Sequence, residues 1–171
     1  MEVAIVESSI PYKLSRNPQT TRLEEVFENP EEGTNCELLV HAIVSARGFV
    51  LPLGIRSSEI YFDREFTREI SDLSQAQTGD IIGLSSQKKA GFKGIHIGIV
   101  WKDNEGNFYV VHNARHAGFA KTQTIDETME HSEHEKIAWI KRPDKENPAL
   151  LQSRKLSELG FGYLARNENF S

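Results

Sequence analysis

The stretch IHIGIVWKDNEGNFYVVHN, residues 95–113, decides the fold class. In IHIGIVW (95–101), alternate positions carry three isoleucines and a tryptophan, which is the pattern of a strand with one apolar face. A second run of β-branched and aromatic residues, NFYVVHN (107–113), follows the turn sequence DNEG (103–106). Two such runs on either side of a short polar turn predict an antiparallel β-hairpin.

Each strand of this hairpin carries a histidine. His96 lies on the face that the isoleucines leave, and His112 lies on the second strand. If Lys102 pairs with Gly106 across the turn, the two histidines lie directly opposite each other on one face, with Cβ atoms about 5 Å apart. A slip of one residue would place them on opposite faces. Gly98, beside His96, leaves room for another backbone to come close.

Outward from the hairpin, the sequence predicts further strands. They are short runs of β-branched and aromatic residues bounded by turn-forming residues, namely DIIGLS (80–85), FAKTQT (119–124) and KIAWIKR (136–142). Cap residues and apolar spacing predict helices over 21–27, 34–47, 56–73 (capped by Ser57 or Ser58), 125–134 and 148–159 (with Pro148 near N1).

The order of these elements predicts the architecture. Helices come first and the sheet second, which favours an α+β domain over a β-α-β alternation. We predict N-terminal helices packed on a mostly antiparallel sheet. The 171 residues suffice for one domain with its own core and are short for two. The predicted domain spans 1–171, with a core over about 33–142 and a C-terminal helical extension over 147–171.

The composition excludes some classes of function. The net charge is −5, with 26% charged and 38% hydrophobic residues, whereas nucleic acid and anionic membranes require a dense basic patch. No nucleic-acid or membrane partner is therefore expected. The N-terminus, MEVAIVESSIPYKL (1–14), has four consecutive apolar residues and no basic flank, unlike a signal peptide or a membrane span. A cytoplasmic location is expected, although a protein exported without a conventional signal would have the same features.

Cys36 is the only cysteine, and it lies at the start of the apolar helix in GTNCELLVHAIV (33–44). Thr34 and Glu37 have the spacing of a capping box, which puts Cys36 at position N2. The unpaired amides and the positive end of the helix dipole favour a thiolate there. We therefore expect the thiol pKa to lie below its free value of about 8.5, and the same amides could bind an oxyanion.

A nucleophilic thiol needs an imidazole partner, and the chain has six histidines. His96 and His112 are the candidates. His41, five residues beyond Cys36 on the same helix, points away from the thiol and is expected to make a polar surface or capping contact. A lone free cysteine is also common as a small buried apolar residue. For any one of these residues taken alone, an ordinary structural role is therefore favoured over catalysis.

Taken together, these segments resemble the NlpC-type cysteine peptidases, papain-like enzymes that cut bacterial cell-wall peptides. The resemblance covers about residues 33–115, roughly half of the chain. TNCELLVHAIV (34–44) resembles the nucleophile helix of that family, GFVLP (48–52) its Gly-x-x-x-Pro exit, TGDII (78–82) its Gly-Asp strand entry, IHIGIV (95–100) its His strand and VVHNA (110–114) its later His strand.

The resemblance implies a papain-like fold and a Cys-His-His triad. Carried over position by position, it implies Cys36 as the nucleophile, His96 as the general base and His112 as the residue that orients His96. It also implies Tyr12 as the counterpart of a tyrosine that the family places upstream of the nucleophile.

The chain departs from the family next to the cysteine. Asn35 precedes it where the family has an acidic residue, and Glu37-Leu38 follow it where the family has a small pair. In the loop after the nucleophile helix, Arg56 and Ser57 could contact a substrate carboxylate, since Arg forms bidentate pairs with carboxylates. A role for Ser57 as a simple helix cap is the more common alternative.

The sequence thus predicts a cysteine hydrolase of peptide amide bonds, with a peptide or a peptidoglycan fragment as substrate and with no cofactor or metal. The spacing of His131 and His134 suits two metal ligands on a helix, but no further ligand cluster accompanies it. Two alternatives stay open. One is an acyltransferase or lipid-type hydrolase that uses the same Cys–His pair, and the other is a non-catalytic peptide-binding module of the same fold.

Overall fold

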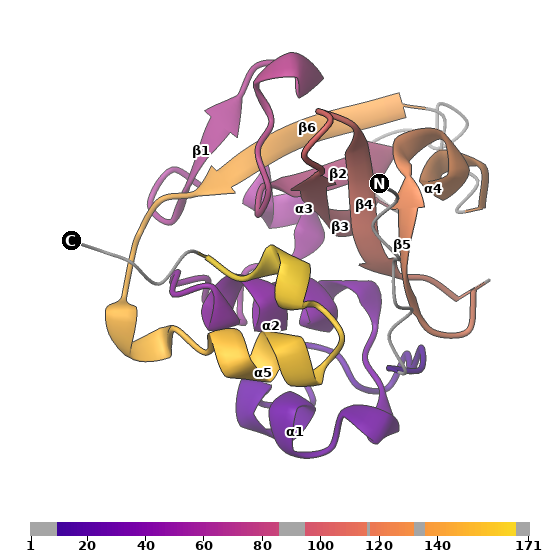
Figure 1. Ribbon diagram of the computed structural model, residues 1–171. Coiled ribbons are helices and arrows are strands. Elements are labelled where there is room, and N and C mark those ends of the chain that lie inside the picture. The colour runs from indigo at the N-terminus through magenta and orange to yellow at the C-terminus, as the bar shows by residue number, and fades with distance from the viewer. Residues whose placement is uncertain (1–9, 86–94, 116, 132–135, 167–171) are drawn as a thin grey trace.

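The structure, a computed structural model, describes residues 10–85, 95–115, 117–131 and 136–166 (Figure 1). Its sheet is built from β1 (Thr67–Ile70), β2 (Ile81–Ser85), β3 (His96–Lys102), β4 (Phe108–Asn113), β5 (Ala120–Thr124) and β6 (Lys136–Pro143). The strand order is β1-β6-β2-β3-β4-β5, and every neighbouring pair is antiparallel. The predicted α+β class and antiparallel sheet are confirmed.

The helices are short, and α2 (Cys36–Ala46) is the longest of those described. None of the helices in this part of the chain has the length and apolar composition that crossing a bilayer requires. The other α-helices are α1 (Leu23–Glu28), α3 (Ser57–Ile60), α4 (Ile125–His131) and α5 (Ser153–Glu158), and the 3₁₀ turns are η1 (Pro30–Glu32), η2 (Leu73–Gln75), η3 (Pro148–Leu150) and η4 (Gly162–Leu164).

Both faces of the central strand β3 are buried. On one face, Ile97 and Ile99 lie in an apolar cluster with Ile43 of α2, and α1, α2 and α5 lie on this side of the sheet (Figure 1). On the other face, Val100 lies in a second apolar cluster, against which Met129 of α4 packs. The long apolar run of β3 therefore follows from burial on both sides rather than from one core face alone.

The predicted β3–β4 hairpin forms with a longer turn than expected. Lys102 pairs with Phe108 rather than with Gly106. The carboxylate of Asp103 accepts hydrogen bonds from two backbone N–H groups within the turn, at 2.8 and 2.9 Å, which stabilises the longer loop. The displacement is two residues, so the two histidines stay on one face but no longer lie directly opposite each other.

The predicted helix over 56–73 is wrong beyond its first turn. Only Ser57–Ile60 is α-helical, and Thr67–Ile70 forms the edge strand β1, which pairs with β6. The carboxylate of Asp63 accepts hydrogen bonds from the backbone N–H groups of Phe66 at 3.1 Å and of Thr67 at 2.8 Å. Such local bonds of an Asp side chain compete with helical hydrogen bonds, so the chain leaves the helix here.

The predicted helix over 148–159 is divided into η3 and α5. The backbone at Leu151, between them, has φ −62° and ψ 119°, which is not helical. After this break the C-terminal segment contributes to the same apolar cluster as α2, and its buried members are Leu156, Leu159, Phe161 and Leu164. The C-terminal segment therefore packs on the same apolar cluster as α2.

Candidate active site

Helix α2 places Cys36 at its first position. The N-cap is Asn35, whose side-chain oxygen accepts a hydrogen bond from the N–H of Leu38 at 2.8 Å. The predicted cap at Thr34 is therefore wrong by one residue, and Cys36 lies at N1 rather than N2. Thr34 is instead held from the sheet, since the side-chain NH₂ of Asn113 donates to its carbonyl oxygen at 3.0 Å.

The Cys36 sulfur lies where β3 and β4 separate. Their pairing ends at Ile99 and Val111, although β3 itself begins at His96. The N–H and C=O of Val100 bond to residues 79 and 80 on the β2 side. Successive backbone N–H groups of a strand point to opposite sides. Ile97 is three residues from Val100, so its N–H points to the β4 side. Pairing with β4 has ended there, and this N–H hydrogen-bonds the Cys36 sulfur.

His96 and His112 are hydrogen-bonded to each other beside this separation. His96 Nε2 lies 2.8 Å from His112 Nδ1, and His112 Nε2 lies 2.8 Å from Gln123 Oε1 on β5. The side-chain amide oxygen of Gln123 can only accept a hydrogen bond, so His112 Nε2 carries the proton. His112 Nδ1 then accepts from His96 Nε2, which leaves the basic lone pair of His96 at Nδ1.

Burial distinguishes the two imidazoles. His96 is 9% exposed and His112 is 1% exposed. His96 is therefore the more exposed of the two residues, and His112 is the inner residue that connects it to Gln123. This is the arrangement that a general base and its orienting partner require.

The contact between the histidines is diagonal, and it depends on Gly98. The last β3–β4 pair is Ile99 with Val111, so the next position places Gly98 opposite His112. The His112 ring therefore extends diagonally past Gly98 to reach His96. A Cβ atom at position 98 would lie 2.5 Å from Cγ1 of Val110, 2.8 Å from the carbonyl oxygen of Val111 and 3.2 Å from Cβ of His112. The absence of a side chain at this position therefore allows the imidazoles to meet.

Gly98→Ala is expected to lower the free energy of unfolding by about 1–3 kcal/mol, since the added methyl group overpacks a buried site. Urea denaturation measures the change. Gly54→Ala is the matched control, because a Cβ atom at Gly54 meets no atom within 4 Å. If Gly98→Ala were as stable as Gly54→Ala, the close approach of β4 to Gly98 would be contradicted.

The predicted low pKa of the thiol is wrong. The pKa of Cys36 is raised from 9.0 to about 11. Burial is the largest cause, the carboxylate of Glu37 adds to it, and hydrogen bonds from the backbone N–H groups of Ile97, Glu37 and Cys36 offset only a part. Desolvation thus outweighs the helix terminus. The thiol stays protonated near neutral pH, and its activation requires a base.

Glu37→Gln is expected to lower the pKa of the Cys36 thiol, because the substitution removes a negative charge that disfavours the thiolate. The rate of alkylation by iodoacetamide, followed against pH, reports the thiol directly, since the chain has one cysteine. The inflection should fall below about 11 in this variant. It should stay unchanged in the control Glu24→Gln, an exposed position on α1. Equal inflections in the two variants would contradict the role of Glu37.

Tyr12 is held beside the nucleophile helix. Its N–H donates to the carbonyl oxygen of Gly118 at 2.8 Å, and its backbone forms a parallel bridge with Thr34. Burial raises the pKa of the Tyr12 phenol, the charge of Cys36 raises it further, and Arg115 lowers it. The phenol and the sulfur therefore lie within electrostatic range of each other.

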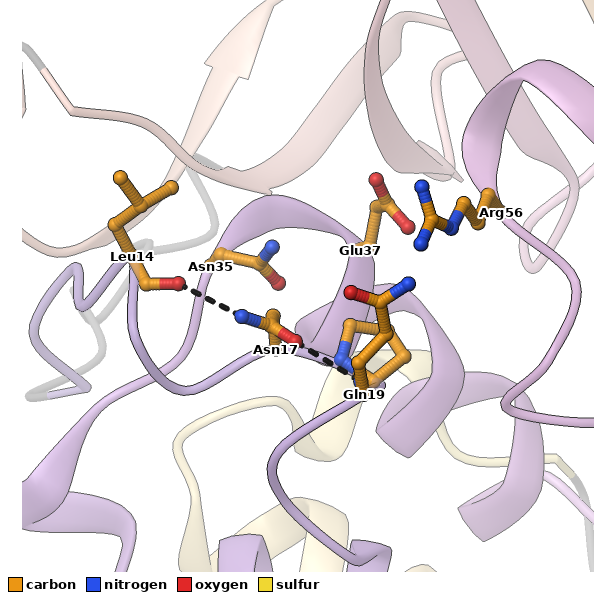
Figure 2. A pocket seen from close by; sticks show the side chains of 7 residues that line it. Leu14, Asn17, Gln19, Asn35, Glu37 and Arg56 are labelled. Carbon is orange, nitrogen blue, oxygen red and sulfur yellow. Dashed lines mark hydrogen bonds between the residues drawn. The ribbon is translucent and has the colours of Figure 1, made fainter.

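A pocket of about 210 Å³ lies at the N-terminus of α2 (Figure 2), and Cys36 itself is not among its lining residues. Asn35 and Glu37, the two neighbours of Cys36, line it together with Arg56, and the other lining residues are Leu14, Asn17, Pro18 and Gln19. The hydroxyl of Ser57 donates to Glu37 Oε1 at 3.3 Å. The structure thus brings the predicted substrate-binding residues Arg56 and Ser57 to the N-terminus of α2.

His41 is buried, contrary to the surface position expected for it. Its Nδ1 lies 3.2 Å from the carbonyl oxygen of Leu51 and its Nε2 lies 3.0 Å from that of Ile55. Burial lowers the pKa of this imidazole. The contacts connect α2 to the loop that precedes Arg56, so His41 supports one wall of the pocket.

Sequence analysis does not identify Gln123 or Asn113 as site residues. Gln123 reaches His112 only because β5 pairs with β4 in a register that places His112 opposite Lys121, and no residue pattern fixes that register in advance. Of the predicted metal pair, His134 and the side chain of His131 lie outside the described residues.

A scan against protein-family models and searches of curated proteins and of solved structures find no match to this chain. The resemblance to the NlpC-type peptidases therefore stays a prediction from the sequence motifs. The α+β class and the site geometry are observations that do not depend on it.

Proposed function

We propose that this chain is a cysteine hydrolase of peptide amide bonds, with a papain-like architecture of the NlpC type. Cys36 is the nucleophile, His96 the general base and His112 the residue that orients His96. Peptides, including the stem peptides of peptidoglycan, are the proposed substrates. Tyr12, Arg56 and Ser57 are the proposed substrate contacts.

The observation that carries this proposal is the hydrogen-bonded chain from Gln123 through His112 to His96, in a strand whose next residue, Ile97, influences the Cys36 sulfur through its backbone N–H. The backbone N–H that hydrogen-bonds the sulfur belongs to Ile97, which directly follows His96 in β3. A lone inert cysteine would not require two buried imidazoles aligned in this way. The alignment fixes the tautomer of His96, which is what a third member of a catalytic triad does.

The mechanism starts from a neutral thiol. His96 Nδ1 removes the proton of Cys36 as the sulfur forms a bond to the substrate carbonyl carbon, and the carbonyl π electrons move to the oxygen. The backbone N–H of Cys36, at the N-terminus of α2, donates to that oxyanion. When the C–N bond breaks, His96 returns its proton to the leaving amine. A water molecule, deprotonated by His96, then hydrolyses the thioester and releases the acid.

Trapping of the acyl group tests this function. The protein is incubated with a mixture of soluble peptidoglycan stem peptides, quenched in acid and analysed by intact-mass spectrometry. The proposal predicts an acyl adduct on Cys36 in the wild type, none in Cys36→Ala, and release of the free acid over time. Transfer of the acyl group to an added amine without release of acid would show an acyltransferase instead.

A second candidate, a peptide-binding module without catalysis, is favoured by one observation. The raised pKa of Cys36 means that the isolated thiol is a weak nucleophile near neutral pH. Labelling by a mild electrophile at pH 7 separates the two candidates. If labelling of the wild type were as slow as labelling of His96→Ala, the binding module would be supported.

A further inference from the structure

We propose that the pocket at the N-terminus of α2, lined by both sequence neighbours of Cys36, selects the substrate by binding one amino-acid unit that carries both an ammonium group and a carboxylate. This inference rests on the proposed function, because it treats the bound unit as part of the substrate that Cys36 attacks. It is carried by two opposite charges on the pocket wall, by the rigidity of that wall and by the pocket's size.

The opposite charges are those of Glu37 and Arg56. Their side chains point toward one another at the pocket (Figure 2). Among the described residues, neither side chain forms an ion pair within the 4.0 Å limit. A ligand with one charge would be attracted by one of these groups and repelled by the other. A ligand with both charges would form a charge-assisted hydrogen bond to each.

The facing wall is held rigidly. The side chain of Asn17 donates to the carbonyl oxygen of Leu14 at 3.1 Å and accepts from the N–H of Gln19 at 2.9 Å, as the dashed lines in Figure 2 show. The carbonyl oxygen of Arg16 accepts from the N–H of Asn35 at 2.9 Å, which joins this loop to the N-cap of the nucleophile helix. Little conformational entropy is therefore lost when a ligand binds.

The size of the pocket indicates a small ligand. Its volume of about 210 Å³ is below the roughly 300–1,000 Å³ typical of sites for drug-sized molecules. Leu14, which is 61% exposed, adds an apolar surface to the polar wall. A single amino-acid unit, with both charged groups free and joined to the rest of the substrate through its side chain, matches this combination.

Occupancy of the pocket is also linked to the reactivity of the thiol. The negative charge of Glu37 raises the pKa of Cys36. An ammonium group bound to Glu37 would offset that charge, so the thiol should ionise more readily when the pocket is filled. The substrate would then contribute to the activation of its own nucleophile.

The test uses the full chain labelled with ¹³C-cysteine, which gives one cysteine signal because Cys36 is the only cysteine. L-alanine and D-alanine are titrated as two-charge probes, and N-acetylalanine and alaninamide as one-charge probes. We expect at least one alanine to shift the Cys36 ¹³Cβ signal saturably and to lower the pKa read from it. We expect each one-charge probe to bind roughly tenfold more weakly or worse, since one charged hydrogen bond is lost.

Two pocket variants and one control variant complete the experiment. Glu37→Gln and Arg56→Gln should each weaken alanine binding roughly tenfold or more, whereas Arg68→Gln, at an exposed position on β1, should not. Equal binding of one-charge and two-charge probes, no saturable shift, or unchanged binding in both pocket variants would overturn the proposal. An acyl adduct on Cys36 without alanine binding would remove this inference and keep the hydrolase. Alanine binding without any adduct would contradict the hydrolase itself.

Discussion

His96→Ala is expected to reduce the rate of peptide cleavage by about 10²–10⁴-fold, the contribution of a positioned general base. The loss should lie toward the upper end of this range, because the pKa of Cys36, raised to about 11, leaves little thiolate near neutral pH. Steady-state cleavage of a stem peptide, followed by chromatography, measures it. A variant that kept the wild-type rate would exclude His96 as the base.

Two substitutions of Gln123, measured by the same cleavage assay, serve as graded controls. Gln123→Leu removes the acceptor that fixes the tautomer of His112, and should cost roughly tenfold in rate, the worth of one buried hydrogen bond. Gln123→Glu keeps an acceptor oxygen and should retain more activity than Gln123→Leu. If the two variants had equal activity, orientation through His112 would play no part in the reaction.

Asp80→Ala is expected to lower the free energy of unfolding by about 3 kcal/mol, because it leaves one partner of a largely buried ion pair uncompensated. Both carboxylate oxygens of Asp80 accept hydrogen bonds from Arg142 on β6, at 2.8 and 2.9 Å, and one also accepts from the N–H of Gln77 at 2.8 Å. The pair connects the start of β2 to β6. Thermal or urea denaturation measures the loss.

The control for Asp80 is an exposed ion pair between the segment before β1 and the segment after β6. Glu65 lies 3.6 Å from Lys145, and their side chains are 69% and 49% exposed. Glu65→Ala should change the free energy of unfolding by less than about 1 kcal/mol, since water screens such a pair. Comparable losses in Asp80→Ala and Glu65→Ala would contradict the assignment of Asp80–Arg142 as a main stabilising contact of the sheet.

The elements that sequence analysis predicts correctly are those with strong local patterns. The alternation in IHIGIVW yields β3, and the β-branched run KIAWIKR yields β6, because side-chain periodicity and β propensity are properties of the segment itself. The apolar spacing after Cys36 yields α2 for the same reason. These predictions are sufficient to place the thiol at a helix terminus and the two histidines on one face of a hairpin.

The errors arise where a single side chain or a distant residue decides the outcome. The Asp103 carboxylate lengthens the β3–β4 turn, and the Asp63 carboxylate ends α3 early. The contact of His112 with Gln123 depends on the register between β4 and β5, which is fixed by long-range packing. None of these effects changes the periodicity of the segment in which it occurs.

The pKa of Cys36 likewise could not be predicted from the local sequence. The sequence places the thiol at the positive end of a helix, which is a local feature, but the extent of burial depends on how β3 and β4 close around it. Three backbone N–H groups, two of them at the start of α2, favour the thiolate, while burial and Glu37 oppose it more strongly. The sign of the net shift therefore follows from the tertiary structure.

The central claim is that His96 activates a thiol which is otherwise protonated, and one measurement tests it most directly. The rate of single-turnover acylation of Cys36 by p-nitrophenyl acetate is followed from pH 5 to pH 11.5, with Cys36→Ala as the blank and His96→Ala as the comparison. The account predicts that the wild type acylates rapidly near neutral pH, while His96→Ala rises only toward the thiol pKa of about 11. Superimposable profiles for the wild type and His96→Ala would contradict it.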